Sequence, residues 1–559
     1  MADRPLPTVT IHPAREQPEL PRERFLREEE PSEEAVHMDV LFVGGGPAGL
    51  AGAIELARLV RENEMEGRGK GSFEIGVLEK AAELGGHTLS GAVVDPRPFR
   101  ELFPDLRDEE FPFRGEVEGE AVYLLTQKAA LRVPTPPTMR NEGNWVASIC
   151  EVVRWMGKKA EELGVNLFPG FPVEALLVEG SRVRGVRTVP AGLDRDGEAG
   201  PGYIAPTDLT AQVTVLAEGV RGPLTRSWLE WEGVRAANPQ IYALGVKELW
   251  EVPGSINRVV HTMGWPLSSD TFGGGWIYPM GNRLVSLGIV VGLDYRDARL
   301  DPHRLLQEMK THPLVRRILQ GGELIEWGAR TIPEGGYHSV PERRHGDGLC
   351  VVGDAAGFVD VPSLKGIHYA VESGVLAARA IFRALEAGDT SEVGLRSYTE
   401  SVDDSFIMRD LYRTRNMRSA FKNGLYSGVL KAGAMTLTGG RFPGGRIPVE
   451  EDASEPRRFG PTPAMPPSED PLYVSKVDAV FKSGNRTRDD LPSHLIVPDD
   501  VAPGLARFYT YLCPAGVYEA RGGSLVVNAP NCVDCKATDI LGPRWTAREG
   551  GSGPAYRRM

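Results

Sequence analysis

The stretch "MDVLFVGGGPAGLAGAIELARLV", residues 38–60, decides the fold class of this chain. Its apolar run Val40–Val43 is typical of a strand that is buried on both faces. A glycine-rich turn with G-x-G-x-x-G spacing follows the run, and a segment rich in Ala and Leu then predicts a helix. A second apolar segment, "FEIGVLEK" (73–80), predicts the next strand. Together these segments predict a βαβ unit that binds a dinucleotide.

The residues of this motif have separate physical roles. Gly44 permits the tight turn, Gly46 lets the backbone approach a pyrophosphate, and Gly49 lets the helix pack closely on the strand. The helix N-terminus offers free N–H groups and a positive dipole end to the phosphates. Glu79 ends the second strand, where we expect it to accept hydrogen bonds from the adenosine ribose.

Two later segments indicate FAD rather than NAD. Residues 213–222 predict a strand that runs into a glycine turn, and residues 346–381 predict a strand, the pair Gly353-Asp354 and a helix. In this order the motifs resemble the FAD-containing family that includes glutathione reductase and para-hydroxybenzoate hydroxylase. The resemblance implies that Asp354 binds the ribityl chain and that Lys365 and Gly366 lie near the isoalloxazine ring. We expect the same FAD site to include Gly86, His87, Ser90, Glu218 and Gly219.

The composition of the chain excludes several classes of protein. With 559 residues it is long enough for about two to four domains, and a formal net charge of −12 does not favour nucleic acid as a partner. Five cysteines cannot form a secreted disulfide framework, and no run of eighteen apolar residues predicts a transmembrane helix. Residues 1–37 have neither a signal peptide nor a transit peptide pattern, so we expect a flexible N-terminal tail on an intracellular protein.

The remaining segments predict a helix, a β-rich region and a linker. Apolar residues along one face of 140–163 predict an amphipathic helix with Gly164 as its cap. Alternating apolar residues predict strands in 165–220 and again in 235–300. Residues 441–475 are rich in Pro, Gly and charge, which is typical of a linker or a wrapping arm.

Stretches over nearly the whole chain resemble the electron transfer flavoprotein–ubiquinone oxidoreductase family. They include "GGGWIYPMGNRLVSLGIVVGLDY" (273–295), "VPSLKGIHYAVESG" (361–374), "FKSGNRTRDDLPSHL" (481–495) and "CPAGVYE" (513–519). The resemblance implies an α/β (α+β) fold with a FAD-binding Rossmann-like domain of the glutathione reductase/para-hydroxybenzoate hydroxylase type. It also implies an inserted β-rich quinone-binding domain and a C-terminal ferredoxin-like iron–sulfur domain.

The domain boundaries that we expect follow from this resemblance and from the segments above. They are 1–37 for the tail, 38–235 and 336–440 for the discontinuous FAD-binding domain, 236–335 for the quinone-binding domain, 441–475 for the linker and 476–559 for the iron–sulfur domain.

The resemblance also implies the function. Members of the family pass electrons from reduced electron transfer flavoprotein through an iron–sulfur cluster and FAD to quinone in the respiratory chain. No catalytic acid or nucleophile is expected, because the redox chemistry belongs to the cofactors. In the family, main-chain groups at a glycine turn hold the quinone head, and Gly273 and Gly274 match that turn. A plain strand-to-strand turn is the alternative for these two glycines.

The resemblance further implies monotopic contact with a membrane. Residues 123–139 and 419–440 match the membrane-facing surface of the family. The second segment is too short and too polar to span a bilayer, but its apolar residues suit a helix that lies in the interface. A surface helix packed on its own protein is the alternative. We expect the protein at the cytoplasmic face of the cell membrane, as a peripheral or monotopic protein.

The cysteines near the C-terminal end raise a question about the cluster. Family members carry four cluster cysteines, and Cys513, Cys532 and Cys535 match the first three. Thr538 stands at the fourth position, where a neutral hydroxyl is a much weaker iron ligand than a thiolate.

Four outcomes are open at this site. A four-iron cluster can take water, Asp534 or Asp539 as its fourth ligand. A three-iron cluster needs only three cysteines. The cluster can be lost, or the site can hold zinc.

Two other functions remain as alternatives. One is a nitrogen-fixation-associated or geranylgeranyl-reductase-like FAD oxidoreductase, which the C-terminal cysteines disfavour. The other is a flavin-binding scaffold with a degenerate cluster site.

Overall fold

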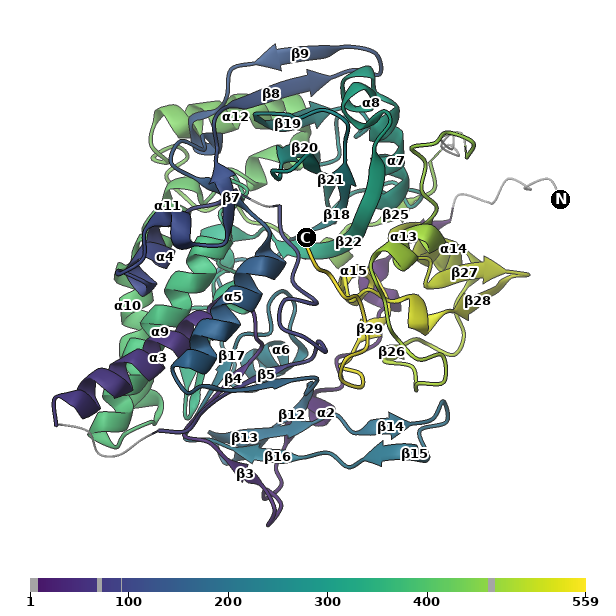
Figure 1. The fold of residues 1–559 in the computed structure, drawn as a ribbon. Coiled ribbons are helices and arrows are strands. Elements are labelled where there is room, and N and C mark those ends of the chain that lie inside the picture. The colour runs from purple at the N-terminus through teal and green to yellow at the C-terminus, as the bar shows by residue number, and fades with distance from the viewer. Residues whose placement is uncertain (1–8, 68–72, 92, 461–467) are drawn as a thin grey trace.

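The computed structural model describes residues 9–67, 73–91, 93–460 and 468–559. Figure 1 shows two large sheets with helices packed around them, and the C-terminal segment beside the sheets on the right of the view. The two largest hydrophobic cores of the described residues follow this arrangement: one belongs to the nucleotide-binding part, and the other to the second sheet together with the C-terminal segment.

The nucleotide-binding part is built on a six-stranded sheet. Its strand order is β11-β5-β4-β17-β24-β23, and every neighbouring pair is parallel except β23 with β24. The bounds are β4 Val40–Val43, β5 Ile75–Glu79, β11 Asn166–Pro169, β17 Val213–Leu216, β23 His345–Gly346 and β24 Leu349–Val351. All residues of β4 and β17 are buried, which confirms the strands predicted from the apolar runs.

Helices cover this sheet. The helix α3 (Pro47–Met65) begins after the glycine turn, as predicted, and packs against α5 (Ile149–Glu162) and α9 (Ile367–Ala387). Further helices of this part are α4 (Arg97–Leu102), α6 (Pro223–Trp231), α10 (Glu392–Asp404) and α11 (Phe406–Thr414).

Two helix starts differ from the prediction. The helix predicted from residue 140 begins at Ile149, because Ser148 accepts a hydrogen bond from the backbone N–H of Glu151 and caps it. Trp145–Ala147 instead forms the strand β10, which pairs with β6 (Val93–Val94) and β7 (Phe113–Glu116). After the Gly353-Asp354 pair only a short 3₁₀ turn forms, and α9 starts thirteen residues later, after Gly366.

The prediction of a flexible N-terminal tail is wrong for residues 9–37. The strands β2 (Leu26–Arg27) and β3 (Val36–His37) are the edges of a five-stranded sheet with β12 (Val173–Glu179), β13 (Arg182–Thr188) and β16 (Asp208–Thr210). The strand β1 (Thr10–Ile11) pairs with β25 (Arg457–Arg458). Two short helices, α1 (Pro13–Glu16) and α2 (Arg22–Phe25), connect β1 to β2 along the chain. These pairings join segments far apart in the chain, so no local pattern reveals them.

The second large sheet has the order β22-β18-β21-β20-β19-β8-β9. Its strands are β8 (Glu120–Leu125), β9 (Ala130–Val133), β18 (Tyr242–Glu251), β19 (Val259–Gly264), β20 (Gly273–Pro279), β21 (Leu284–Gly292) and β22 (Glu323–Pro333). The helices α7 (Pro302–Thr311) and α8 (Pro313–Leu319) follow β21, and α7 packs on the sheet. A separate helix, α12 (Leu425–Leu437), lies at the same end of the molecule as β8 and β9 in Figure 1.

The C-terminal segment consists of short elements. They are α13 (Lys476–Lys482), β26 (Leu495–Ile496), α14 (Pro503–Leu512), β27 (Tyr518–Arg521), β28 (Ser524–Val527), α15 (Ala537–Leu541) and β29 (Arg544–Trp545). Buried residues of this segment share one core with the second large sheet. The hairpin of β14 (Ala191–Leu193) and β15 (Ala199–Ile204) completes the described strands.

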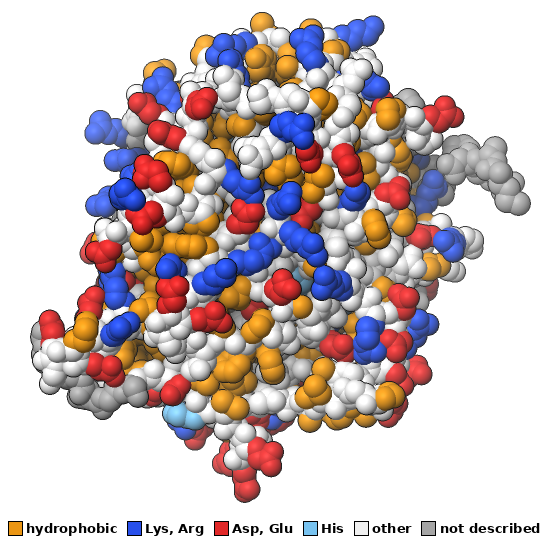
Figure 2. Space-filling model, in the orientation of Figure 1, with side chains coloured by type: hydrophobic (Ala, Val, Ile, Leu, Met, Phe, Trp, Pro, Cys, Tyr) orange, Lys and Arg blue, Asp and Glu red, His pale blue; other side chains and the backbone are white. Residues whose placement is uncertain are grey.

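Lys and Arg side chains are mixed with Asp and Glu over the face drawn in Figure 2, with basic side chains prominent across its middle. A net negative charge therefore does not make this face uniformly acidic.

Candidate functional site

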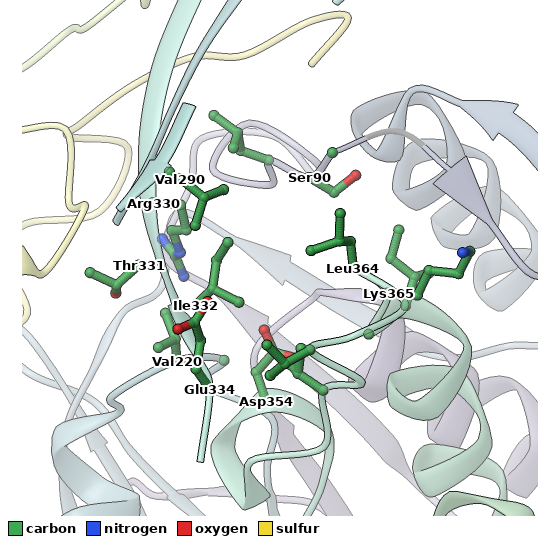
Figure 3. Close-up of a pocket in the computed structure, with 18 of the residues that line it drawn as sticks. Ser90, Val220, Val290, Arg330, Thr331, Ile332, Glu334, Asp354, Leu364 and Lys365 are labelled. Atoms are coloured by element: carbon green, nitrogen blue, oxygen red, sulfur yellow. The ribbon is translucent and has the colours of Figure 1, made fainter. Parts of the chain in front are cut away.

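A cavity of about 800 Å³ runs between the two large sheets. It extends from Gly46, at the N-terminus of α3, past Asp354 and Gly273 to Leu437 on α12. Figure 3 shows Arg330, Thr331 and Ile332 on one side of this cavity, Leu364 and Lys365 on the other, and Asp354 in the lower part of the view.

The nucleotide end of the cavity is shaped by the three motif glycines. A side chain at Gly44, whose φ is +121°, would bring its Cβ 2.3 Å from the Ala217 carbonyl oxygen, and a Cβ at Gly49 would lie 2.1 Å from the Gly44 oxygen. A Cβ at Gly46 would meet nothing within 4 Å. The first and third glycines are therefore required by the fold, whereas the open space at Gly46 is left for a ligand at the helix N-terminus.

Glu79 lies at the end of β5 and lines this end of the cavity. Its carboxylate accepts hydrogen bonds from the backbone N–H groups of Gly45 (3.0 Å) and Ala81 (2.8 Å). These bonds hold the carboxylate beside the glycine turn, where a ribose attached to the pyrophosphate would lie.

The middle of the cavity is formed by the Gly353-Asp354 turn and the start of α9. Burial raises the pKa of the Asp354 carboxyl to about 6, and Arg330 opposes this shift. Gly366 is the N-cap of α9, and Lys365 donates from its Nζ to the Ser363 carbonyl oxygen at 3.0 Å. Hydroxyl donors that reach Asp354 would stabilise its charged form.

Several predicted residues lie at the cavity wall and others do not. The residues that line it are Gly44, Gly46, Glu79, His87, Ser90, Glu218, Gly219, Gly273, Gly274, Asp354, Lys365 and Gly366. The carboxylate of Glu218 caps α6, since it accepts from the N–H and hydroxyl of Thr225 at 2.8 and 2.7 Å. Gly49, Gly86 and Gly353 lie behind the wall; Gly86, for example, accepts a hydrogen bond from the Tyr556 N–H.

The His87 side chain lacks hydrogen-bond partners within the described chain. It is buried, and neither of its ring nitrogens has a hydrogen-bond partner among the described residues. Burial lowers the pKa of His87 well below its usual value, and the neighbouring charge of Lys80 lowers it further. A neutral imidazole at the cavity wall can still donate or accept a hydrogen bond toward a ligand.

Gly273 and Gly274 begin the strand β20 and do not form a turn, so that prediction needs correction. A Cβ at Gly273 would lie 2.1 Å from the Val290 oxygen, and one at Gly274 would lie 2.5 Å from the Thr262 oxygen. Both residues line the cavity. Since glycine has no side chain, Gly273 and Gly274 line the cavity with backbone atoms alone.

The far end of the cavity opens among apolar side chains of α12. Val429, Leu430 and Leu437 are 46%, 76% and 90% exposed, whereas Met435 is buried. The guanidinium of Arg418 lies 3.9 Å from the Phe272 ring centroid, and it pairs with Glu334 at 2.7 Å. This buried ion pair holds Phe272 beside the glycines of β20.

The three C-terminal cysteines are buried and lie in one site. Cys513 follows α14, and Cys535 lies between Asp534 and Lys536, both of which have a positive φ. Burial raises the pKa of the Cys513 and Cys535 thiols, and it raises that of Cys532 to about 12. Backbone N–H groups donate to each of the three sulfurs, from Ala515 and Val517, from Asp534, and from Ala537.

These features fit a cluster bound by sulfur. Buried thiols with raised pKa values become thiolates when metal binds, and N–H donors stabilise that charge. Within the described chain, the ligand atoms that come within 4.8 Å of one another belong to His494, Cys532 and Asp534, not to the three cysteines. Sulfurs around a single zinc ion lie about 3.8 Å apart, so a three-cysteine zinc site does not fit.

The cysteine site and the cavity share a wall. Thr331, which lines the cavity, donates from its backbone N–H to the Cys535 carbonyl oxygen at 3.0 Å. Lys536 donates from its Nζ to the carbonyl oxygens of Val220 (3.1 Å) and Arg221 (3.2 Å). The Arg330 guanidinium donates to the backbone carbonyl oxygen of Asp534 at 3.4 Å. Reasoning from sequence missed Arg330, Thr331 and Lys536, because no motif marks them and their contacts are long-range.

Fold and site together define a FAD-dependent oxidoreductase with a C-terminal iron–sulfur domain. The family model described as "ETF-QO, ubiquinone-binding" matches residues 242–332, and the one described as "Electron transfer flavoprotein-ubiquinone oxidoreductase, 4Fe-4S" matches residues 471–557. The chain belongs to the electron transfer flavoprotein–ubiquinone oxidoreductase family, which confirms the resemblance.

Relatives match over nearly their whole length. The mitochondrial electron transfer flavoprotein-ubiquinone oxidoreductase of Arabidopsis thaliana is 37% identical, over 94% of this chain and 85% of that protein. The Homo sapiens protein of that name is 37% identical, over 94% of this chain and 90% of that protein. A solved structure of a geranylgeranyl bacteriochlorophyll reductase-like protein from Thermoplasma acidophilum is 21% identical with a TM-score of 0.55, over 72% of this chain and 90% of that one. This last likeness concerns the fold alone.

Across the ranges that the structure describes, no helix is both long enough and apolar enough to cross a membrane.

Proposed function

We propose that this protein passes electrons from reduced electron transfer flavoprotein, through an iron–sulfur cluster and FAD, to quinone. The observation that carries the proposal is the shared wall between the two sites. The Cys535 carbonyl accepts a hydrogen bond from Thr331, and Thr331 lines the cavity that holds the nucleotide motifs and the glycines of β20. Electrons that arrive at the cysteine site therefore have a short route to the cavity.

The proposed FAD site uses the nucleotide end and the middle of the cavity. The N-terminus of α3 at Gly46 would bind the pyrophosphate, Glu79 the ribose and Asp354 the ribityl chain. Lys365 and Gly366 would lie near the isoalloxazine ring, with His87 and Ser90 on the cavity wall. Bound FAD supplies the redox chemistry, and these side chains orient it.

The proposed quinone site lies at the other end. Main-chain groups of Gly273 and Gly274 would hold the quinone head, and Phe272 would form its wall. The apolar opening at α12 suits entry of an isoprenoid tail. Electrons leave in pairs on quinone, and water supplies the protons of the quinol.

The apolar surface around this opening supports peripheral membrane contact. Tyr426, Leu430 and Leu437 on α12 are 71%, 76% and 90% exposed, and Leu131 on β9 is 64% exposed. Apolar side chains on an amphipathic helix insert into the bilayer interface without spanning it. We place this surface on the cytoplasmic face of a cell membrane.

The domain division belongs to the same proposal. Residues 38–235 and 336–440 would hold FAD, 236–335 quinone and 476–559 the cluster, with 441–475 as an arm between them. Arg457 in this arm is fully buried and donates to the carbonyl oxygen of Leu293 at 2.5 Å, which supports a wrapping arm over a free linker.

A coupled assay tests the function. The purified protein with bound FAD is mixed with reduced electron transfer flavoprotein and a short-chain quinone, and quinone absorbance is followed. Sustained quinone reduction that needs all three components is expected. Cys535→Ala should lower the rate about tenfold or more, while Cys350→Ala in β24, away from the site, should not. If the protein reduced no quinone, or if this donor could not reduce its flavin, the proposal would be rejected. The alternative of a flavin-binding scaffold with a degenerate cluster site would then remain.

A further inference from the structure

The cluster site has three cysteines where the matched family model describes a 4Fe-4S domain. Thr538 stands at the fourth position and is 8% exposed. It is the second residue of α15, directly after the loop that carries Cys535. The type of cluster therefore depends on whether any nearby group can replace the fourth thiolate.

Thr538 lies beside the cysteine site. It follows Cys535 by three residues in the chain, and the backbone N–H of Ala537, the residue before it, donates to the Cys535 sulfur. Ala537 also belongs to the same buried core as the three cysteines. A threonine hydroxyl is neutral and binds iron weakly, so Thr538 occupies the ligand position without supplying a ligand.

Asp534 is already paired with cations and is therefore not free to act as the fourth iron ligand. Its carboxylate pairs with Lys80 at 2.6 Å and Arg548 at 3.0 Å, and it accepts from the Trp545 indole N–H at 3.0 Å. Ligation of iron would take the carboxylate from the buried Arg548 and the partly exposed Lys80, and leaving a buried charge without its partner is strongly unfavourable.

Asp539 is engaged in the same way on the other side of α15. Arg221 and Arg226 contact one carboxylate oxygen at 2.8 and 3.2 Å. The other oxygen accepts from the Trp545 backbone N–H at 3.0 Å. Both aspartates that could stand in for a cysteine are therefore already committed to buried ion pairs.

His494 is the remaining candidate. Its ring is buried, and Nε2 has no hydrogen-bond partner among the described residues. Its ligand atom lies within 4.8 Å of those of Cys532 and Asp534. A fourth ligand must reach a different corner of a cluster from Cys532, whereas His494 crowds that sulfur on the side of the Asp534 ion pairs.

We infer that Cys513, Cys532 and Cys535 bind a three-iron cluster in this protein, in place of the four-iron cluster of its family. Three thiolates complete the ligand set of a three-iron cluster, and the missing corner falls at Thr538. A four-iron cluster on the same thiolates would need water on its fourth iron, and the burial of Thr538 and the three cysteines keeps bulk water from that position. The inference shares one element with the proposed function, which is that an iron–sulfur cluster is bound at the cysteine site.

Electron paramagnetic resonance of protein purified without oxygen tests the inference, because oxygen can strip an iron from a four-iron cluster. The expected result is a signal in the oxidised protein that disappears on reduction, with about three irons per chain by chemical and Mössbauer analysis. Added ferrous iron and a thiol reductant should not change it. A four-iron signal in the reduced wild-type protein, uptake of a fourth iron or absence of iron would each overturn the inference.

Variants at the fourth position complete the test. Thr538→Cys should gain a fourth iron, with a signal only after reduction, and bound FAD absorbance reports whether it folds. Thr538→Ala and His494→Ala should keep the oxidised signal of the wild type; loss of iron in either variant would identify that residue as a ligand and contradict the inference. These spectra do not depend on turnover, so a failure of quinone reduction with a three-iron signal present would reject the proposed function alone.

Discussion

Gly46 and Gly49 lack side chains for two different reasons, which a matched pair of alanine variants separates. Gly46→Ala should unfold like the wild type, since a Cβ there meets nothing within 4 Å. Its FAD affinity should fall by about tenfold or more, or at least about 1.4 kcal/mol, because the methyl group occupies the space of the pyrophosphate. Isothermal titration of the apoprotein with FAD measures this.

Gly49→Ala should instead destabilise the fold itself. Its Cβ would lie 2.1 Å from the Gly44 oxygen, so α3 must shift from β4, at a cost of about 1–3 kcal/mol or more. Urea unfolding of the apoprotein measures the loss. Equal unfolding of the two variants would contradict both assignments.

Asp354 should make the apoprotein less stable as the pH rises. Burial raises its pKa from 3.8 to about 6, so the folded state holds a proton that the unfolded state has lost. The free energy of unfolding should fall between about pH 4 and pH 6 by up to about 3 kcal/mol, and by less if water in the cavity solvates the carboxylate.

Asp354→Asn tests this by urea unfolding of the apoprotein at pH 5 and pH 7. The variant should lose the pH-dependent part, be more stable than the wild type at pH 7, and bind FAD more weakly. Asp196→Asn, in the exposed turn between β14 and β15, serves as the control. A variant that loses as much stability between the two pH values as the wild type would show that Asp354 is not the group responsible.

At the scale of elements, α12 should bind the protein to lipid. Leu430→Glu with Leu437→Glu replaces two side chains that are 76% and 90% exposed, and each buried leucine contributes about 1.5–3 kcal/mol. Co-sedimentation with vesicles should therefore fall at least about tenfold. Reduction of a short-chain quinone should persist, because that substrate does not need the bilayer.

A matched control for α12 is Val393→Glu on α10, where the side chain is 66% exposed away from the opening. It should co-sediment like the wild type. Unchanged sedimentation of the α12 double variant would remove the support for membrane contact through this helix.

At the scale of the whole molecule, residues 556–559 join the C-terminal segment to the FAD-binding part. Tyr556 is 3% exposed and donates from its N–H to the Gly86 oxygen at 2.8 Å. The Met559 oxygen accepts from the Ser148 hydroxyl at 3.1 Å, at the start of α5. Tyr556→Ala should cost about 3–5 kcal/mol and lower the midpoint of thermal unfolding.

The control for this prediction is Arg558→Ala, since the exposed side chain leaves the backbone bond from Arg558 to Glu326 intact. Its unfolding midpoint should match the wild type. If Tyr556→Ala unfolded like this control, the segment would not couple the two parts.

Local patterns predicted the nucleotide unit closely and the long-range contacts poorly. The strand Val40–Val43 was predicted to the residue, because apolar runs and glycine turns are properties of a few neighbouring residues. Trp145 fits the apolar spacing of a helix, yet its pairing with Val94 draws it into β10. The two-residue strands β2 and β3 escaped prediction because their partners lie more than a hundred residues away.

The residue pattern alone shows a dinucleotide motif, three C-terminal cysteines and a threonine where the family has a fourth. The packing shows that neither nearby aspartate replaces the thiolate missing at Thr538, because Asp534 pairs with Lys80 and Arg548, and Asp539 pairs with Arg221 and Arg226. Motifs depend on residues that are neighbours in the chain. Buried ion pairs between segments hundreds of residues apart depend on packing, which brings the cysteine site and the flavin cavity to one wall.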